Sequence, residues 1–396
     1  MQKYLRTVHF LKQCWEVFWR FLILGCISFG GPGAHIGYFQ HTFVEKLAWL
    51  SSDTYAKIIS ISQILPGPGS SQMGFAIGLH KAGLAGGIAA FIGFTLPSFI
   101  LMYWLAVSLD LDRPDKWLLS LTYSLKLLAV VVVLDAAINM FSSFCKTRLT
   151  VLIMLLSVML LVLHPSFITQ ALVLFIAMLI GMVSSSKRHK DQVALTRAFK
   201  NLNWPPLVLF IGVFIVSIGL SQQDSLAGLF AIFYKNGSLV FGGGHVVLPL
   251  LQTSIAEYLT QQQFLFGYAA AQGVPGPMFT MATFMGAQWF DSAPLCGAIL
   301  ATLGIFLPGF LLILGIHHSW QSLTLHPKFI GGSTGINAAV VGLLVATLYN
   351  PVFVSAVHNY SDLALVVGGF LGLRLLKLPI LALMMFFIVF GFLSGS

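Results

Sequence analysis

Long runs of apolar residues dominate the chain, and short polar or glycine- and proline-containing stretches separate them. A helix that crosses a bilayer needs roughly 20 mostly apolar residues, or fewer where other protein segments shield it. Several runs are shorter than that, so we expect an all-α polytopic membrane protein with about 10 to 13 transmembrane segments. The clearest runs are Ala82–Val107, Leu118–Phe144, Leu149–Leu163, Phe167–Val183, Leu207–Leu220, Leu295–Ile316, Gly331–Leu348, Leu363–Leu373 and Leu378–Leu393.

The composition agrees with this pattern and excludes several classes of protein. Of the 396 residues, 57% are hydrophobic and 8% are charged, whereas soluble domains carry about 25% charged residues. The net charge of +9 comes from basic residues in short loops beside apolar runs, which the positive-inside rule explains without a nucleic-acid partner. The four cysteines are scattered without metal-ligand spacing. We therefore expect a protein in contact with membrane lipid, without metal, cofactor or nucleic acid.

Three landmarks recur in the same order in the two halves of the chain. The second copies follow the first at offsets of 212, 209 and 211 residues. Single matches of such glycine- and proline-containing motifs would be weak, but three at nearly constant offset indicate a duplicated domain. The pairs are FGGPG (29–33) with FGGGH (241–245), ILPGP (64–68) with GVPGP (273–277), and FTLPSF (94–99) with IFLPGF (305–310).

The repeat sets the expected domain boundaries and topology. We expect a first transmembrane repeat at 1–186, a basic cytoplasmic linker at 187–206, an extra transmembrane helix at 207–225 and a second repeat at 226–396. The linker and the N-terminus are rich in lysine and arginine, so both should be cytoplasmic. One extra crossing before the second repeat would give it inverted topology, a common arrangement in secondary transporters.

Each half contains two breaks in its helices, one at the FGG motif and one at the Pro-Gly-Pro motif. Broken backbone at membrane depth is tolerated where it faces protein or a water-filled cavity. Proline suits the first turn of a helix, and helix N-termini attract anions. We therefore expect an anion site between the breaks; motifs that only kink helices or allow close helix packing are the alternative. The candidate binding residues are Gly30, Gly31, Pro66, Gly67, Pro68, Ser70, Ser71, Gly242, Gly243, Gly244, His245, Pro275, Gly276, Pro277 and Thr280.

These motifs resemble the chromate ion transporter family, specifically its long, two-domain members. The matching stretches are SFGGPGAHIGYF (28–39), SQILPGPGSSQMGFAIG (62–78), LVFGGGHVVLPLL (239–251) and QGVPGPMFTMATFMG (272–286). The resemblance covers nearly the whole chain, although the last third of each half matches only in hydropathy. It implies export of chromate across a bacterial inner membrane, driven by the proton motive force, with sulfate as the ion that chromate mimics.

Ionisable side chains inside apolar segments are expensive and are functional candidates. Asp135 lies within a valine-rich run with Asn139 one turn away, and its repeat partner is Leu344. His35 and His245 lie beside the two FGG motifs, and imidazole titrates near neutrality. Asp135, His35 and His245 are therefore the candidates for proton coupling. The alternatives are a neutral, hydrogen-bonded aspartic acid and packed or interfacial histidines.

No motif of a catalytic nucleophile, a phosphate-binding loop or a dinucleotide site occurs in the sequence, so we expect a protein that is not an enzyme. We expect a secondary active transporter in which one half rocks against the other, with chromate as substrate. Sulfate or another oxyanion is the first alternative, and a passive anion channel is the second. A homodimer could be its assembly state.

Overall fold

The computed structural model describes residues 2–29, 31–109, 111, 115–185, 202–317, 319 and 326–394, and this part of the chain is helical without a strand. The first half contains α1 (Gln2–Ile27), α2 (Gly31–Phe39), the π-helix η1 (Gln40–Lys46), α3 (Ser52–Ile64), α4 (Gly69–Ser108), α5 (Lys116–Phe144), α6 (Arg148–Leu163) and α7 (Phe167–Ser185). The extra helix that precedes the second repeat is α9 (Trp204–Leu220). It includes the last three residues of the expected linker, while residues 187–201 of that linker lie outside the described part.

The second half repeats the order of the first. It contains α10 (Leu226–Gly237), the 3₁₀-helix η2 (Gly244–Val246), α11 (Val247–Ile255), α12 (Gln261–Gly273), the 3₁₀-helix η3 (Met278–Thr280), α13 (Met281–Trp289), α14 (Pro294–Ile316), α16 (Pro327–Thr347), the π-helix η4 (Leu348–Phe353), α17 (Tyr360–Arg374) and α18 (Ile380–Ser394). Helix α4 has non-helical backbone angles at Ala82 and Gly83, at the position where the second half has two separate helices, α13 and α14. The expectation of an all-α protein with two homologous halves is confirmed.

Glycine contacts between neighbouring helices repeat as well. A Cβ atom placed on Gly78 would lie 2.2 Å from the carbonyl oxygen of Gly86, and one on Gly286 would lie 2.3 Å from that of Gly297. Both pairs join the segment after the Pro-Gly-Pro motif to the helix that follows it. Small residues let helix backbones approach this closely, which is the usual way to pack helices in a membrane. The duplication therefore extends to the helix–helix contacts themselves.

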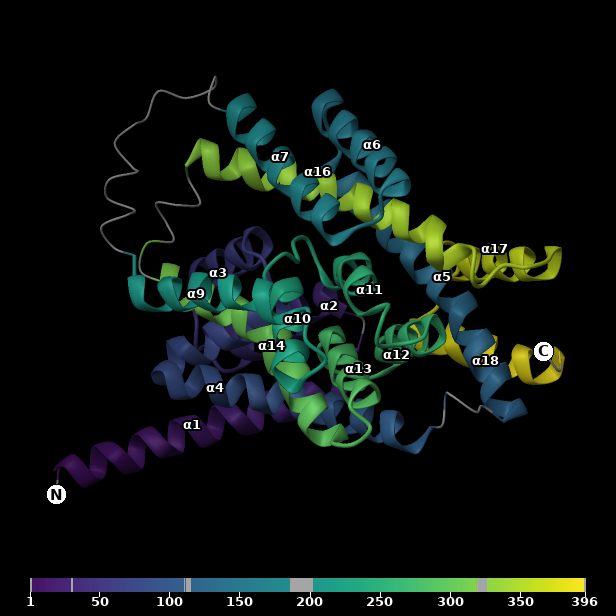
Figure 1. Ribbon diagram of the computed structural model, residues 1–396. Coiled ribbons are helices and arrows are strands. Elements are labelled where there is room, and N and C mark those ends of the chain that lie inside the picture. Colours follow the sequence, from purple (N-terminus) through teal and green to yellow (C-terminus); the bar gives the residue numbers. More distant parts are fainter. Residues whose placement is uncertain are drawn as a thin grey trace.

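The halves exchange their last helices. Helices α6 and α7 of the first half pack against α16 of the second, while α17 and α18 of the second half pack against α5 of the first. Figure 1 shows α6, α7 and α16 side by side, with α17 and α18 beside the long α5. The sequence halves are therefore not separate rigid bodies. A motion of one whole half against the other would pull each terminal helix pair off its partner, and the rocking of the halves stays a prediction.

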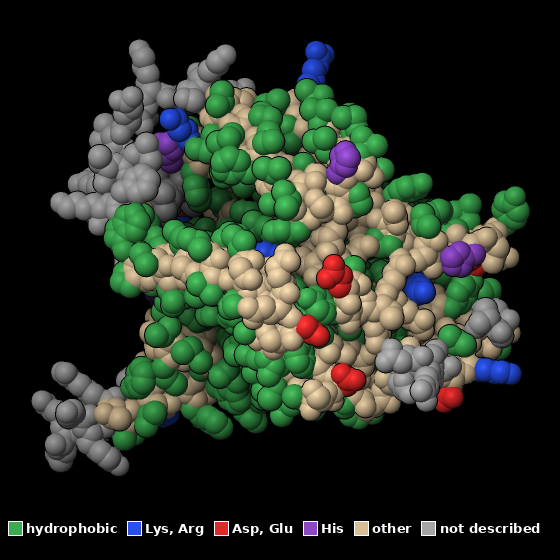
Figure 2. Space-filling view, viewed as in Figure 1, with side chains coloured by type: hydrophobic (Ala, Val, Ile, Leu, Met, Phe, Trp, Pro, Cys, Tyr) green, Lys and Arg blue, Asp and Glu red, His purple; other side chains and the backbone are tan. Residues whose placement is uncertain are grey.

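The surface and the helix lengths are those of a multi-pass membrane protein. In the described part, α4, α5, α7, α14 and the continuous segment Pro327–Phe353 are long and apolar enough to span a membrane, and α6, α9 and residues 380–393 are shorter apolar helices. Apolar side chains cover much of the face seen in Figure 2, where charged side chains are few. Such a surface is stable in lipid, where an apolar face needs no cover. The total number of crossings stays a prediction.

Candidate functional site

The four expected breaks all interrupt helices. Helix α1 ends at Ile27 and α2 begins at Gly31; in the second half α10 ends at Gly237 and helical structure resumes at Gly244. The Pro-Gly-Pro motifs separate α3 from α4 and α12 from η3. Gly67 and Gly276, the central residues of these motifs, have φ angles of +125° and +104°. Only glycine adopts such angles without strain, so each motif depends on its central residue.

The two Pro-Gly-Pro turns join the halves in a reciprocal way. The Gly67 N–H donates to the carbonyl of Val240, which precedes the second FGG motif, at 2.7 Å. The Gly276 N–H donates to the carbonyl of Ser28, which precedes the first FGG motif, at 2.9 Å. Exchanging the halves exchanges these two bonds, as a two-fold pseudo-symmetry axis requires. Both N–H groups are thus paired across the halves, and binding of an anion at Gly67 and Gly276 stays a prediction.

A cavity of about 360 Å³ lies where the two FGG breaks meet. Its walls come from both halves: α2 and α5 of the first, and the FGGGH segment, α12, the second Pro-Gly-Pro turn, α17 and α18 of the second. We call it the central pocket. It is lined by Gly31, Gly33, Val132, Asp135, Ala136, Asn139, Met140, Gly242, Gly243, Gly244, His245, Ala271, Gln272, Val274, Gly276, Met278, Leu373 and Ile380.

Bare backbone forms part of the pocket wall. A Cβ atom added to Gly31, Gly33 or Gly243 would meet no atom within 4 Å, so these glycines face open space and a ligand can approach their backbone. Gly31 is the first residue of α2, and Gly244 is the first residue of the continuous helical segment η2–α11. The first N–H groups of a helix lack intrahelical acceptors and carry partial positive charge. Two helix N-termini therefore reach the pocket from the FGG breaks, whereas the sequence pointed to the helices after the Pro-Gly-Pro breaks.

Asp135 forms an ion pair across the halves at the pocket wall. Its Oδ1 lies 2.5 Å from Nε of Arg374, the last residue of α17. Asn139 holds both partners, because its amide nitrogen donates to Asp135 Oδ2 and its oxygen accepts from Arg374, each at 2.8 Å. The Asp135 and Arg374 side chains retain 22% and 34% of their exposure, and Asp135 lines the central pocket. In the sequence, Arg374 lies near Lys377 at the end of an apolar run, a pattern that indicates only membrane topology, and nothing local marks Arg374 as a partner of Asp135.

The two candidate histidines have different surroundings. His245 lines the central pocket, and its Nδ1 lies 2.8 Å from the hydroxyl of Tyr268 on α12. Tyr268 is fully buried and went unnoticed in the sequence. His35 is fully buried outside the pocket lining, edge-on to the ring of Phe94, with Nε2 3.4 Å from the carbonyl of Ser28. The structure therefore places His245, and not His35, beside Asp135 at the pocket.

The remaining candidates lie around the pocket without lining it. Ser70 and Ser71 are buried in the first turn of α4, and Pro68 is the N-cap residue of that helix. The Thr280 hydroxyl donates to the carbonyl of Pro277 at 2.8 Å. Gly30 lies outside the described residues. Among the candidates, the pocket thus brings together Gly31, Gly242, Gly243, Gly244, His245, Gly276 and Asp135, but not Pro66, Gly67, Pro68, Ser70, Ser71, Pro275, Pro277, Thr280 or His35.

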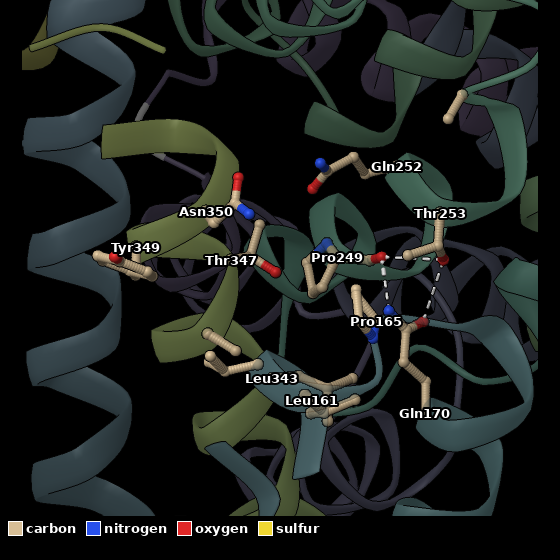
Figure 3. A pocket seen from close by; sticks show the side chains of 13 residues that line it. Leu161, Pro165, Gln170, Pro249, Gln252, Thr253, Leu343, Thr347, Tyr349 and Asn350 are labelled. Atoms are coloured by element: carbon tan, nitrogen blue, oxygen red, sulfur yellow. Dashed lines mark hydrogen bonds between the residues drawn. The ribbon is translucent and has the colours of Figure 1, made fainter. Parts of the chain in front are cut away.

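A second pocket, of about 310 Å³, lies between the turn that joins α6 and α7, the end of α11, and the α16–η4 segment (Figure 3). The Gln170 amide nitrogen donates to the carbonyl of Pro249, and Thr253 donates to the Gln170 oxygen. The lining of this second pocket includes no charged side chain, and its polar residues are Gln170, Gln252, Thr253, Thr347 and Asn350. The central pocket, by contrast, is lined by the charged residue Asp135, the partner of Arg374.

Comparison with known proteins agrees with the repeat and identifies the family. The model of the chromate transporter family matches residues 15–182 and again residues 227–392. The chain belongs to the chromate transporter family. The two matches begin and end at corresponding helices of the two halves, and both include the FGG and Pro-Gly-Pro motifs that build the central pocket.

Individual members of the family are similar to this chain over most of its length. A chromate transport protein of Pseudomonas aeruginosa is 28% identical over 84% of this chain and 79% of its own. A probable chromate transport protein of Synechococcus elongatus is 27% identical over 85% of this chain and 84% of its own. An uncharacterized transporter of Methanocaldococcus jannaschii is 26% identical over 84% and 82% of the two chains. No solved structure matches this chain.

Proposed function

We propose that this protein is a secondary active transporter that exports chromate, with the central pocket as the anion-binding site. The observation that carries the proposal is the convergence on one cavity of both FGG breaks, the second Pro-Gly-Pro turn and the Asp135–Arg374 pair. The naming of the Pseudomonas aeruginosa relative as a chromate transport protein supports the choice of ion.

The pocket offers what a tetrahedral dianion requires. Two helix N-termini each supply about half a positive charge, exposed glycine backbone supplies N–H donors, and Arg374 supplies a planar fork of donors that matches two oxyanion oxygens. The volume of about 360 Å³ is within the range of small-molecule sites. None of these groups distinguishes chromate from sulfate, so sulfate is the alternative substrate that the geometry favours.

Energy coupling is the finer part of the proposal. We propose that the proton motive force drives export across a bacterial inner membrane, with Asp135 or His245 carrying the coupled proton because both line the pocket. Because the halves exchange their terminal helices, the moving bodies would each combine helices from both halves. The N-terminus would be cytoplasmic and the repeats inverted, which reporter fusions at the two ends and in the linker would test.

The test is uptake of labelled chromate into everted membrane vesicles from cells that express the protein, compared with vesicles that lack it. We expect respiration-dependent uptake that an uncoupler abolishes and that excess sulfate reduces. Uptake of sulfate without chromate would assign the pocket to sulfate, and flux that persists when the uncoupler is present would instead support a passive pathway.

A further inference from the structure

The ion pair between Asp135 and Arg374 differs from the other contacts that join the two halves. The Gly67 and Gly276 bonds occur as a symmetry-related pair, but Asp135 corresponds to Leu344, and α6, the counterpart of α17, ends at Leu163 without a basic residue. The duplicated architecture therefore does not require this pair. Its asymmetry and its place at the pocket wall point to a function in transport.

Few charged groups face Asp135. Arg374 approaches from α17 and contacts Asp135 and Asn139, which line the central pocket, and His245 of the FGGGH segment lines the same pocket. The acidic residue of α17, Asp362, accepts a hydrogen bond from Tyr123, which lies more than three turns from Asp135 along α5. The described residues of α18 include no titratable side chain. Arg374 is thus the cation whose position decides whether Asp135 is paired.

We propose that Arg374 is the cationic ligand of the transported oxyanion and that Asp135 competes with the anion for it, so that a proton binds together with the anion. This proposal rests on the proposed function of the pocket. The guanidinium donates to the carboxylate when the pocket is empty, and it donates to the oxygens of the anion when the pocket is filled. Asp135 and Asn139, the two side chains that Arg374 contacts, both line the pocket, so an anion bound there would compete with them for the guanidinium.

The exchange of Asp135 for the anion as the partner of Arg374 determines how many protons move with each anion. When the anion takes Arg374, the carboxylate of Asp135 loses its counter-ion at membrane depth, where an unpaired charge is expensive. It gains a proton from water in the pocket, so that an O–H bond forms on one carboxyl oxygen while Asn139 still bonds the other. When the anion leaves, the proton returns to water and Arg374 returns to Asp135. A dianion and one proton thus move together with a net charge of −1. The membrane potential, which is the electrical part of the proton motive force and is negative inside, drives that charge outward, whereas a pH gradient that is alkaline inside opposes the outward proton.

The experiment uses the full-length protein in liposomes, with labelled chromate and labelled sulfate as the probes. Apparent affinity is measured between pH 5.5 and 8.5, together with exchange and net transport driven by a pH gradient. For the wild type we expect anion affinity to fall as pH rises, because the ionised Asp135 holds Arg374. Asp135→Asn should bind the anion about tenfold more tightly at high pH and lose the pH dependence, and a pH gradient should no longer drive its net transport. Arg374→Gln should lose anion binding, and Arg374→Lys should be intermediate because it keeps the charge but not the planar fork.

A matched control removes a carboxylate from an ion pair elsewhere. Asp53→Asn breaks the exposed pair with Lys57 on α3 and should leave affinity and its pH dependence as in the wild type. The double variant Asp135→Arg with Arg374→Asp restores an ion pair between α5 and α17, but the carboxylate and the guanidinium have exchanged positions. Recovery of wild-type affinity and pH dependence by this double variant would overturn the proposal, because it would show that the pair only fastens the two halves.

Other outcomes separate the two levels of the proposal. If the wild type transports neither ion, the proposed function fails. If the wild type transports an anion but Asp135→Asn keeps wild-type pH dependence, or binds the anion more weakly, then the competition between Asp135 and the anion is wrong while the proposed function stands.

Discussion

Replacing Gly276 with alanine should destabilise the joint between the two halves without removing its hydrogen bond. The backbone N–H that donates to Ser28 remains in this variant, so the added methyl group is the whole perturbation. Its carbon would lie 2.9 Å from Oγ of Ser98 and 3.3 Å from the carbonyl oxygen of Phe94. The residue would also have to keep a φ angle near +104°, which side-chain-bearing residues rarely adopt.

Two terms add to the expected cost. Forcing a non-glycine residue into a sparsely populated backbone region costs about 1–3 kcal/mol. Overpacking a well-packed site by one carbon costs typically about 1–3 kcal/mol. The sum, about 2–6 kcal/mol, is a large part of the stability of a typical protein. Ser98→Ala removes the atom that lies closest to the new methyl group, so the double variant should recover the packing part and keep the backbone part.

The assay is the thermal midpoint of aggregation of purified protein in one detergent, measured by fluorescence-detected size-exclusion chromatography. Gly83→Ala is the matched control, because Gly83 has a φ angle of +60° but a Cβ atom there would meet no neighbour. We expect the thermal midpoint to fall most for Gly276→Ala and less for the double variant. Gly83→Ala should lower the midpoint by about the same small amount as the double variant does. A Gly276→Ala variant as stable as the wild type, or one that Ser98→Ala does not improve, would refute the reasoning.

Two further predictions concern the same repeat. Gly67→Leu and Gly276→Leu should each abolish chromate uptake into everted vesicles while the protein still reaches the membrane, because the side chain would separate the two halves where the Pro-Gly-Pro turns join them. Normal uptake by both variants would remove the Pro-Gly-Pro turns from the transport mechanism. Gly286→Val should lower the thermal midpoint more than Gly368→Val. The Cβ atom at position 286 would lie 2.3 Å from the carbonyl oxygen of Gly297, while the space at Gly368 is open. Equal midpoints would contradict the close approach of α13 and α14.

Much of the fold could be predicted from local sequence. Apolar runs such as Leu118–Phe144 are long enough to span a membrane, and helix α5 has nearly those bounds. Glycine and proline interrupt helices for reasons of backbone geometry that do not depend on distant residues, so the breaks at Phe29–Gly33 and Pro66–Pro68 were visible in advance. The constant spacing of the motifs indicated the duplication, which the helix order and the family matches confirm.

The candidate site was predictable only in part. Gly243 and His245 were expected at the site because they belong to a repeated motif, and both line the central pocket. Which helix N-termini reach the central pocket could not be predicted, since the FGG and Pro-Gly-Pro breaks have the same local chemistry. The difference arises because the N–H groups of Gly67 and Gly276 are taken by carbonyl groups of the opposite half.

The sequence by itself determined that the chain is a helical membrane protein with two related halves and four breaks in its helices, because hydropathy, proline and glycine act locally. Only the tertiary structure decided that the halves exchange their terminal helices, that both FGG breaks and the second Pro-Gly-Pro turn line one pocket, and that Arg374 pairs with Asp135, a residue 239 positions away. Packing over the whole chain determines which residues so far apart in the sequence come into contact. That packing leaves no periodic or compositional signal around either residue.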